Sequence, residues 1–149
     1  EVIFPIPFPN GVGLSPDEAT LYVAETETGR LWKFDIIGPG EVAKMPYPSP
    51  SGGVYLWGSA QYQRLDSLKV EANGRVCVGT LIRGGITSVL PDGNREEFAQ
   101  LTDRSTTNLC FGGDHMQTAF VTLSSTGQLI RMPWTRPGLK LNFQDIVKY

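Results

Sequence analysis

The sequence predicts an all-β protein, a partial β-propeller of about three four-stranded antiparallel blades. Seventeen glycines and eleven prolines divide 149 residues into many short segments, which is typical of strands joined by tight turns. The same order of strand, turn, strand, glycine-containing loop and alternating strand also occurs three times. Propeller blades repeat about every 40 to 50 residues, whereas a β-sandwich does not repeat the same pattern, so the propeller is favoured.

The first repeat begins with an apolar strand at Asn10 and reverses at Pro16-Asp17-Glu18, and its second strand ends at Glu25. A third strand over residues 29–35 alternates apolar and polar side chains, as a half-buried strand requires. A more polar fourth strand is expected at Val42–Pro46. Glu25, at a strand end, is expected to be solvated.

The second repeat covers residues 66–80 and 85–93, with a turn at Asn73-Gly74 and a fourth strand at Arg95–Leu101. The third covers residues 108–122 and 127–134, with a turn at Gly113-Asp114 and a fourth strand at Lys140–Phe143. Asn-Gly and Gly-Asp favour the positive-φ geometries that reverse strands.

The interval between the first two repeats is longer and contains an insertion at residues 46–62. Its Pro, Gly and Ser predict a loop rather than a strand. We therefore expect residues 1–149 to form one partial propeller, with blades at about 9–50, 65–101 and 105–143.

Charge and composition exclude some classes of partner. The net charge is −2 and basic residues are scattered, so neither nucleic acid nor an anionic membrane surface is expected as a partner. No apolar run approaches the ~18 residues of a membrane span. Cys77 and Cys110 lie in apolar runs and are expected to be free buried thiols of a cytoplasmic protein.

Several motifs resemble those of the senescence-marker-protein / gluconolactonase / luciferin-regenerating-enzyme family. The resemblance extends over nearly the whole chain and corresponds to the C-terminal half of six-bladed members about twice as long. The motifs are Pro9-Asn10-Gly11, Ser15-Pro16-Asp17, Leu21–Glu25, Thr107–Gly113, Gly127–Trp134 and Pro137–Phe143.

The resemblance implies a lactonase that binds one divalent cation on the propeller axis and acts on a lactone or sugar-acid substrate. The cation is expected to be Ca, Mg, Mn or Zn, and the resemblance leaves its identity open. By position, Asn10 and Asp66 are the expected metal ligands, and Asp66 the expected general base. The family's third ligand, a glutamate, has no counterpart here, and neither do its substrate-binding Arg and Asn.

The residues themselves are consistent with such a site. Asn10, Asp66 and Asn108 are expected at the same place in three repeats, where the innermost strands start and converge on one mouth of a channel. Their oxygens suit a hard cation. Asn108, Ser67 and Trp57 are weaker candidates for substrate contact, Trp57 as part of an aromatic lid. Without the resemblance, Asn10 is equally explained by a turn and Asp66 by a bond to its own loop.

Other interpretations stay open. Three blades leave two packing faces exposed. We expect the propeller to be completed either by further blades that this sequence lacks or by a second copy in a homodimer; the alternative is a non-catalytic fragment or assembly module. A strictosidine-synthase-like or paraoxonase-like propeller shares the Pro-Asn-Gly and Ser-Pro-Asp motifs, although the Thr107–Gly113 block favours the gluconolactonase type. The only histidine, His115, is expected to be an exposed turn residue.

Overall fold

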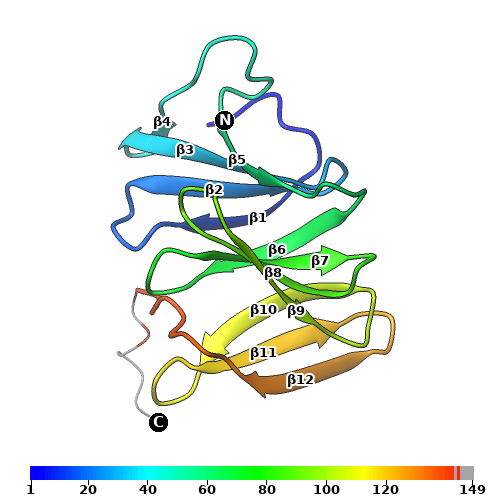
Figure 1. Ribbon diagram of the computed structural model, residues 1–149. Coiled ribbons are helices and arrows are strands. Elements are labelled where there is room, and N and C mark those ends of the chain that lie inside the picture. The colour runs from blue at the N-terminus through cyan, green and yellow to red at the C-terminus, as the bar shows by residue number, and fades with distance from the viewer. Residues whose placement is uncertain (143, 145–149) are drawn as a thin grey trace.

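The computed structural model describes residues 1–142 and 144 and confirms the all-β prediction. Its strands form three antiparallel sheets of five, four and three strands, stacked one after another in chain order (Figure 1). The strands are β1 (Pro9–Leu14), β2 (Thr20–Glu25), β3 (Arg30–Gly38), β4 (Glu41–Val42), β5 (Val54–Gly58), β6 (Arg64–Val70), β7 (Val76–Leu81), β8 (Gly85–Val89), β9 (Glu96–Gln100), β10 (Thr106–Gly112), β11 (Thr118–Leu123) and β12 (Gln128–Pro133).

The first sheet corrects the prediction that residues 46–62 form only a loop. Within that segment β5 pairs antiparallel with β3, and Arg30 lies opposite Gly58. Leu56 anchors this strand, because its side chain is buried in the core while its neighbour Tyr55 is exposed. The fourth strand expected at Val42–Pro46 is reduced to β4, which pairs with the far end of β3.

The second sheet has the four predicted strands in the order β6-β7-β8-β9. The third sheet contains only β10-β11-β12, so the fourth strand expected at Lys140–Phe143 is wrong over residues 140–142, and Phe143 lies outside the described residues. The chain leaves this sheet after β12, because the amide of Leu139 donates a 2.9 Å hydrogen bond to the carbonyl of Val70 at the end of β6.

The predicted turns are confirmed by hydrogen bonds between backbone groups three residues apart. Glu18 N donates to Ser15 O at 2.9 Å, and Gly74 N donates to Glu71 O at 2.8 Å. Gly74 has a φ of +86°, a conformation that residues with a side chain seldom adopt. Short reversals of this kind let consecutive strands pair as neighbours.

Apolar side chains fill the spaces between the sheets. Tyr22, Leu31 and Leu56 of the first sheet pack against β6 and β7, and Cys77 and Ile86 of the second sheet pack against β10 and β11. On the opposite face of the first sheet, Ile3 and Ile6 of the N-terminal segment cover Trp32 and Phe34. The described residues contain no long apolar helix of the kind that crosses a membrane.

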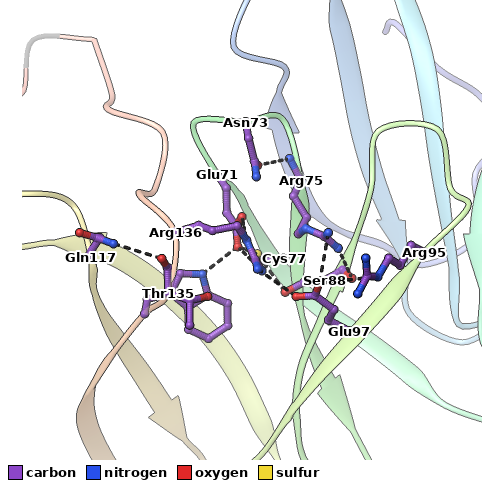
Figure 2. A network of polar contacts seen from close by, with 11 residues as sticks. Glu71, Asn73, Arg75, Cys77, Ser88, Arg95, Glu97, Gln117, Thr135 and Arg136 are labelled. Atoms are coloured by element: carbon purple, nitrogen blue, oxygen red, sulfur yellow. Dashed lines mark hydrogen bonds and ion pairs between the residues drawn. The ribbon is translucent and has the colours of Figure 1, made fainter.

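A buried ion pair fastens the end of the chain to the second sheet. Glu71, in the turn after β6, is fully buried and accepts hydrogen bonds from Trp134 Nε1 at 2.8 Å and from Arg136 Nε at 2.5 Å. Figure 2 shows Arg136 between Glu71 and Glu97, with its Nη1 3.0 Å from a Glu97 oxygen. The hydrogen bond to Glu71 raises the pKa of Arg136 above its ordinary value.

Residues 134–142, here termed the C-terminal strap, contact all three sheets. The amide of Ala72 donates to the Pro137 carbonyl at 2.9 Å, and the amide of Gly138 donates to Met116 O at 2.8 Å. Asn142 Nδ2 donates to Glu18 Oε1, in the turn between β1 and β2, at 2.9 Å. The strap therefore joins the turns at one end of the three sheets.

Cys77 also lies against Glu71. Its Sγ is 3.3 Å from Glu71 Oε1. Burial, and after it the charge of Glu71, raise the pKa of this thiol, so it stays protonated near neutral pH. Both cysteines are free, and Cys110 is exposed, contrary to the prediction that it is buried.

Replacing Glu71 by Gln removes the charge while keeping the side-chain shape. Because Arg136 then keeps only its ion pair with Glu97, we expect the free energy of unfolding to fall by about 1 to 3 kcal/mol, as measured by urea denaturation. The exposed Glu41→Gln is the control and is expected to change stability by less than about 0.5 kcal/mol. Equal stabilities of the two variants would contradict this role of Glu71.

Candidate active site

The inner strand of each sheet carries the same irregularity near its start. In β1, Pro9 pairs with Glu25 and Val12 pairs with Val23, so two residues, Asn10 and Gly11, face one residue of β2. Such a β-bulge bends the strand and redirects side chains. The equivalent pairs are Leu65 with Thr80 and Leu68 with Val78 in the second sheet, and Thr106 with Leu123 and Leu109 with Val121 in the third.

Two glycines bring the three bulges close together. A Cβ atom on Gly11 would lie 2.6 Å from the Asp66 carbonyl oxygen and 2.5 Å from the Leu68 amide nitrogen. Gly79, opposite the bulge of β6, would meet the Thr107 carbonyl at 2.9 Å if it had a Cβ. The strands thus approach backbone to backbone, which places the bulges of β1, β6 and β10 in a continuous row.

Asn10 and Asp66 hold the first position of their bulges. Asp66 is half-buried and Asn10 is exposed. Within the described part of the chain, no hydrogen bond or ion pair engages the carboxylate of Asp66 or the side-chain amide of Asn10. Two oxygen-bearing side chains on neighbouring bulges are therefore free to bind a ligand.

The third repeat departs from the predicted alignment by one residue. The pairing of β10 with β11 gives the first bulge position to Thr107 and the second to Asn108, so Asn108 corresponds to Gly11 and Ser67 rather than to Asn10 and Asp66. Asn108 Oδ1 accepts a hydrogen bond from the Leu109 amide at 2.8 Å. The side chain of Asn108 is therefore engaged by its own strand.

The remaining predicted residues lie in different surroundings. Ser67 is half-buried beside Asp66 in the bulge of β6. Trp57 belongs to β5, opposite Leu31, and packs against the core between the first and second sheets. Tyr55 meets the ring of Trp32 edge-on, with 5.8 Å between ring centroids. The sheet thus holds Trp57, the residue predicted to belong to a lid, and its neighbour Tyr55 in place.

One acidic residue near the site was not recognised from sequence. Glu25 pairs with Pro9 and is only 2% exposed, contrary to the expectation that it is solvated. It accepts hydrogen bonds from Trp32 Nε1 at 3.0 Å and from the hydroxyl of Thr28. The sequence did contain a signal for this burial, because Trp32 follows Glu25 by seven residues, on the next predicted strand, and can donate a hydrogen bond to it.

A cation would find an incomplete set of ligands on this chain. The described residues contain no group of three His, Cys, Asp or Glu side chains able to hold a metal ion. Asn10 and Asp66 offer one amide oxygen and one carboxylate, which suit a hard cation. They fit part of a coordination shell, since Ca²⁺ takes about six to eight oxygens.

One cavity adjoins the inner strands just beyond the bulges, where Val12 and Leu68 are among the residues that line it. Its volume is about 400 Å³, and it is lined by Leu14, Val70, Phe111, Leu141 and neighbouring residues. Neither Asn10 nor Asp66 lines it. Geometry and chemistry therefore locate the candidate site at the bulges, and His115, exposed in the turn after β10, lies at the opposite end of that strand.

Comparisons with known proteins agree with this fold. The sequence model of the SMP-30/Gluconolactonase/LRE-like region matches residues 1–125, whereas a comparison with curated proteins found no match. A luciferin-regenerating enzyme is similar with a TM-score of 0.73 and 15% identity, and a calcium-binding regucalcin of Agrobacterium tumefaciens str. C58 with 0.70 and 18%. A gluconolactonase of Xanthomonas campestris is similar with 0.66 and 22%.

The close approach of the bulges is testable at Gly11. An alanine there would press its Cβ on backbone atoms of β6, so we expect Gly11→Ala to lower the free energy of unfolding by about 1 to 3 kcal/mol. Gly38→Ala in β3 is the matched control, because its Cβ would meet only ordinary contacts with Glu41. A Gly11→Ala variant as stable as the control in urea would refute the arrangement.

The alignments cover 91%, 90% and 86% of this chain but only 49%, 50% and 38% of the luciferin-regenerating enzyme, the regucalcin and the gluconolactonase. The chain thus spans half or less of the length of these relatives, and at these identities the similarity shows the fold alone. Together with the family match over residues 1–125, the three stacked sheets show that this chain belongs to the SMP-30/gluconolactonase/LRE-like family and has the fold of about half of its propeller.

Proposed function

We propose that this chain forms one half of the propeller of a divalent-cation-dependent hydrolase that opens lactones of sugar acids. The observation that carries the proposal is the pair of unpartnered oxygen-bearing side chains, Asn10 and Asp66, on adjacent bulges of neighbouring inner strands. The family supports it, since the similar structures include a gluconolactonase and a protein described as calcium-binding.

Asn10 and Asp66 would hold the cation through an amide oxygen and a carboxylate oxygen. Ca²⁺, Mg²⁺ and Mn²⁺ match these donors better than Zn²⁺, which prefers nitrogen and sulfur ligands. A bound cation supplies two kinds of chemistry to ester hydrolysis, polarisation of the carbonyl and a lower pKa for a bound water. The remaining ligands come from water or from protein outside the described residues.

Asp66 also suits the role of general base. Its carboxylate is half-buried and has no protein partner among the described residues, so it is free to accept the proton of a water that attacks the lactone carbonyl. As the ring C–O bond breaks, Asp66 returns that proton to the leaving ring oxygen. The product is the open hydroxy acid.

Replacing Asp66 by Asn keeps the side-chain shape and removes the base. We expect Asp66→Asn to lower kcat/KM for gluconolactone about 10²- to 10⁴-fold in the presence of Ca²⁺ or Mn²⁺, as followed by acid release in a weakly buffered assay. Asp114→Asn, at an exposed aspartate in the turn after β10, is the control and is expected to be unchanged. Full activity of Asp66→Asn would reject the assignment.

We propose in addition that a second copy of the chain completes the ring. In such a ring the open outer face of the third sheet, where Leu129 is 70% exposed and Cys110 of β10 is exposed, would meet the first sheet of the second copy, whose outer face carries Ile3 and Ile6. The corresponding face of the first sheet is buried against the second sheet, and that of the second sheet is buried against the third. A ring of two copies would also bring two Asn10–Asp66 pairs to one mouth.

Light scattering on a sizing column tests this assembly. We expect a mass of about twice 16.3 kDa, with the dimer strengthened by Ca²⁺. Leu129→Glu would place a charge in the joint and shift the protein towards monomer. Ile37→Glu, at a residue 67% exposed on β3, is the control and should stay dimeric. A wild-type monomer at micromolar concentration would exclude the paired ring and favour a non-catalytic fragment.

A further inference from the structure

Thr107 occupies in the third sheet the place that Asn10 and Asp66 occupy in the first and second. All three residues hold the first position of a bulge in which two residues oppose one. Gly79 brings the backbone of Thr107 against the strand that pairs with Asp66, since a Cβ on Gly79 would lie 2.9 Å from the Thr107 carbonyl. The third bulge therefore lies next to the second, and its first residue carries a hydroxyl group.

The hydroxyl of Thr107 is paired with a second one. Thr107 Oγ1 lies 2.9 Å from Thr122 Oγ1, and the hydroxyl of Thr122 also lies 3.3 Å from the carbonyl oxygen of Asn108, to which it can donate. Because Thr122 donates to the Asn108 carbonyl, Thr107 donates to Thr122 and both hydroxyl hydrogens are in use. The pair therefore offers free acceptor lone pairs on its exposed side. These acceptor sites suit the hydroxyl groups of a ligand, which can donate to them.

A buried aspartate fixes the start of β10. Asp103 is 2% exposed; its Oδ1 accepts from the Ser105 amide at 2.6 Å, and its Oδ2 accepts from the Thr126 amide at 2.7 Å. Burial by itself would raise the pKa of Asp103, but these hydrogen bonds outweigh it and lower the pKa below its ordinary value. The carboxylate thus stays charged and holds the loops on both sides of the hydroxyl pair.

The hydroxyl of the residue before Thr107 is also fixed. Thr106 is fully buried and its Oγ1 donates to the Asp103 carbonyl at 3.0 Å. With Asp103 bound to Thr126 as well, the start of β10 is anchored at several points before the bulge begins. A hydroxyl pair held in this way loses little freedom when it binds a ligand, which favours selective hydrogen bonding.

We infer that Thr107, supported by Thr122, is a specificity residue that binds the hydroxyl groups of a polyhydroxylated lactone or of the aldonic acid formed from it. This assignment rests on the proposed function for its setting at the Asn10–Asp66 site. It predicts that sugar-derived lactones are preferred over lactones without hydroxyl groups, because only the former reach this pair.

The direct test is the affinity of the full chain for gluconate, measured by isothermal titration calorimetry in the presence of Ca²⁺. Loss of one neutral hydrogen bond raises a dissociation constant about tenfold. We therefore expect Thr107→Val to raise the dissociation constant for gluconate about tenfold, and Thr107→Ser to restore the wild-type value. The matched control is Thr118→Val, at the other end of β11 and likewise half-buried, which is expected to bind like wild type.

Kinetics give the second readout. Thr107→Val is expected to raise KM for gluconolactone about tenfold with little change in kcat, and to leave KM for δ-valerolactone, which has no hydroxyl groups, unchanged. Equal effects on both lactones, unchanged gluconate affinity in Thr107→Val, or no gluconate binding by wild type would each overturn the inference. Hydroxyl-dependent gluconate binding without hydrolysis of either lactone would support the Thr107 site while refuting the proposed catalytic function.

Discussion

Backbone-to-backbone packing of the inner strands sets the geometry on which the candidate site depends. Gly11 and Gly79 leave no side chain between β1, β6 and β10 at the level of the bulges. The strands therefore come close enough for three bulges to form one row, and each bulge turns a polar residue out of the regular alternation. With larger residues at these two positions the three strands would lie farther apart. The oxygens of Asn10, Asp66 and Thr107 would then not share one surface.

The opposite end of the sheets is organised by charge rather than by close backbone contact. Glu71 is buried with a full set of donors from Trp134 and Arg136, and the C-terminal strap continues from them to the turns of the other two sheets. A buried pair of this kind adds little net stability compared with apolar packing, but the loss of one partner is costly. The bulges and the strap therefore hold the same three sheets from opposite ends.

Much of the fold was predictable because alternation and turn chemistry are local. Asn73-Gly74 and the alternating third strands required no tertiary information. β5 was missed because the flanking Pro, Gly and Ser residues outweighed a short run in which only Leu56 needed burial. The expected fourth strand at Lys140–Phe143 competed with the bonds that draw the strap to the second sheet, and those bonds depend on Glu71, which is distant in sequence.

The candidate site was predictable in part, for a similar reason. The sequence places Asn10 and Asp66 at the start of inner strands, but a bulge is a relation between two strands, so a single strand does not reveal it. Asn108 and Thr107 were therefore confused, and only the pairing of β10 with β11 separates them. Glu25 was misjudged because its burial depends on Trp32 and Thr28 in the following strand and loop.

The distance along the chain between Glu71 and its partners has a consequence for synthesis. Trp134 and Arg136 lie 63 and 65 residues after Glu71, so the ribosome completes the second sheet well before either donor exists. Until then the carboxylate has to stay hydrated, because burying it alone would cost several kcal/mol. The turn after β6 is thus expected to stay open to water in the nascent second sheet until Trp134 and Arg136 have been synthesised and can close it.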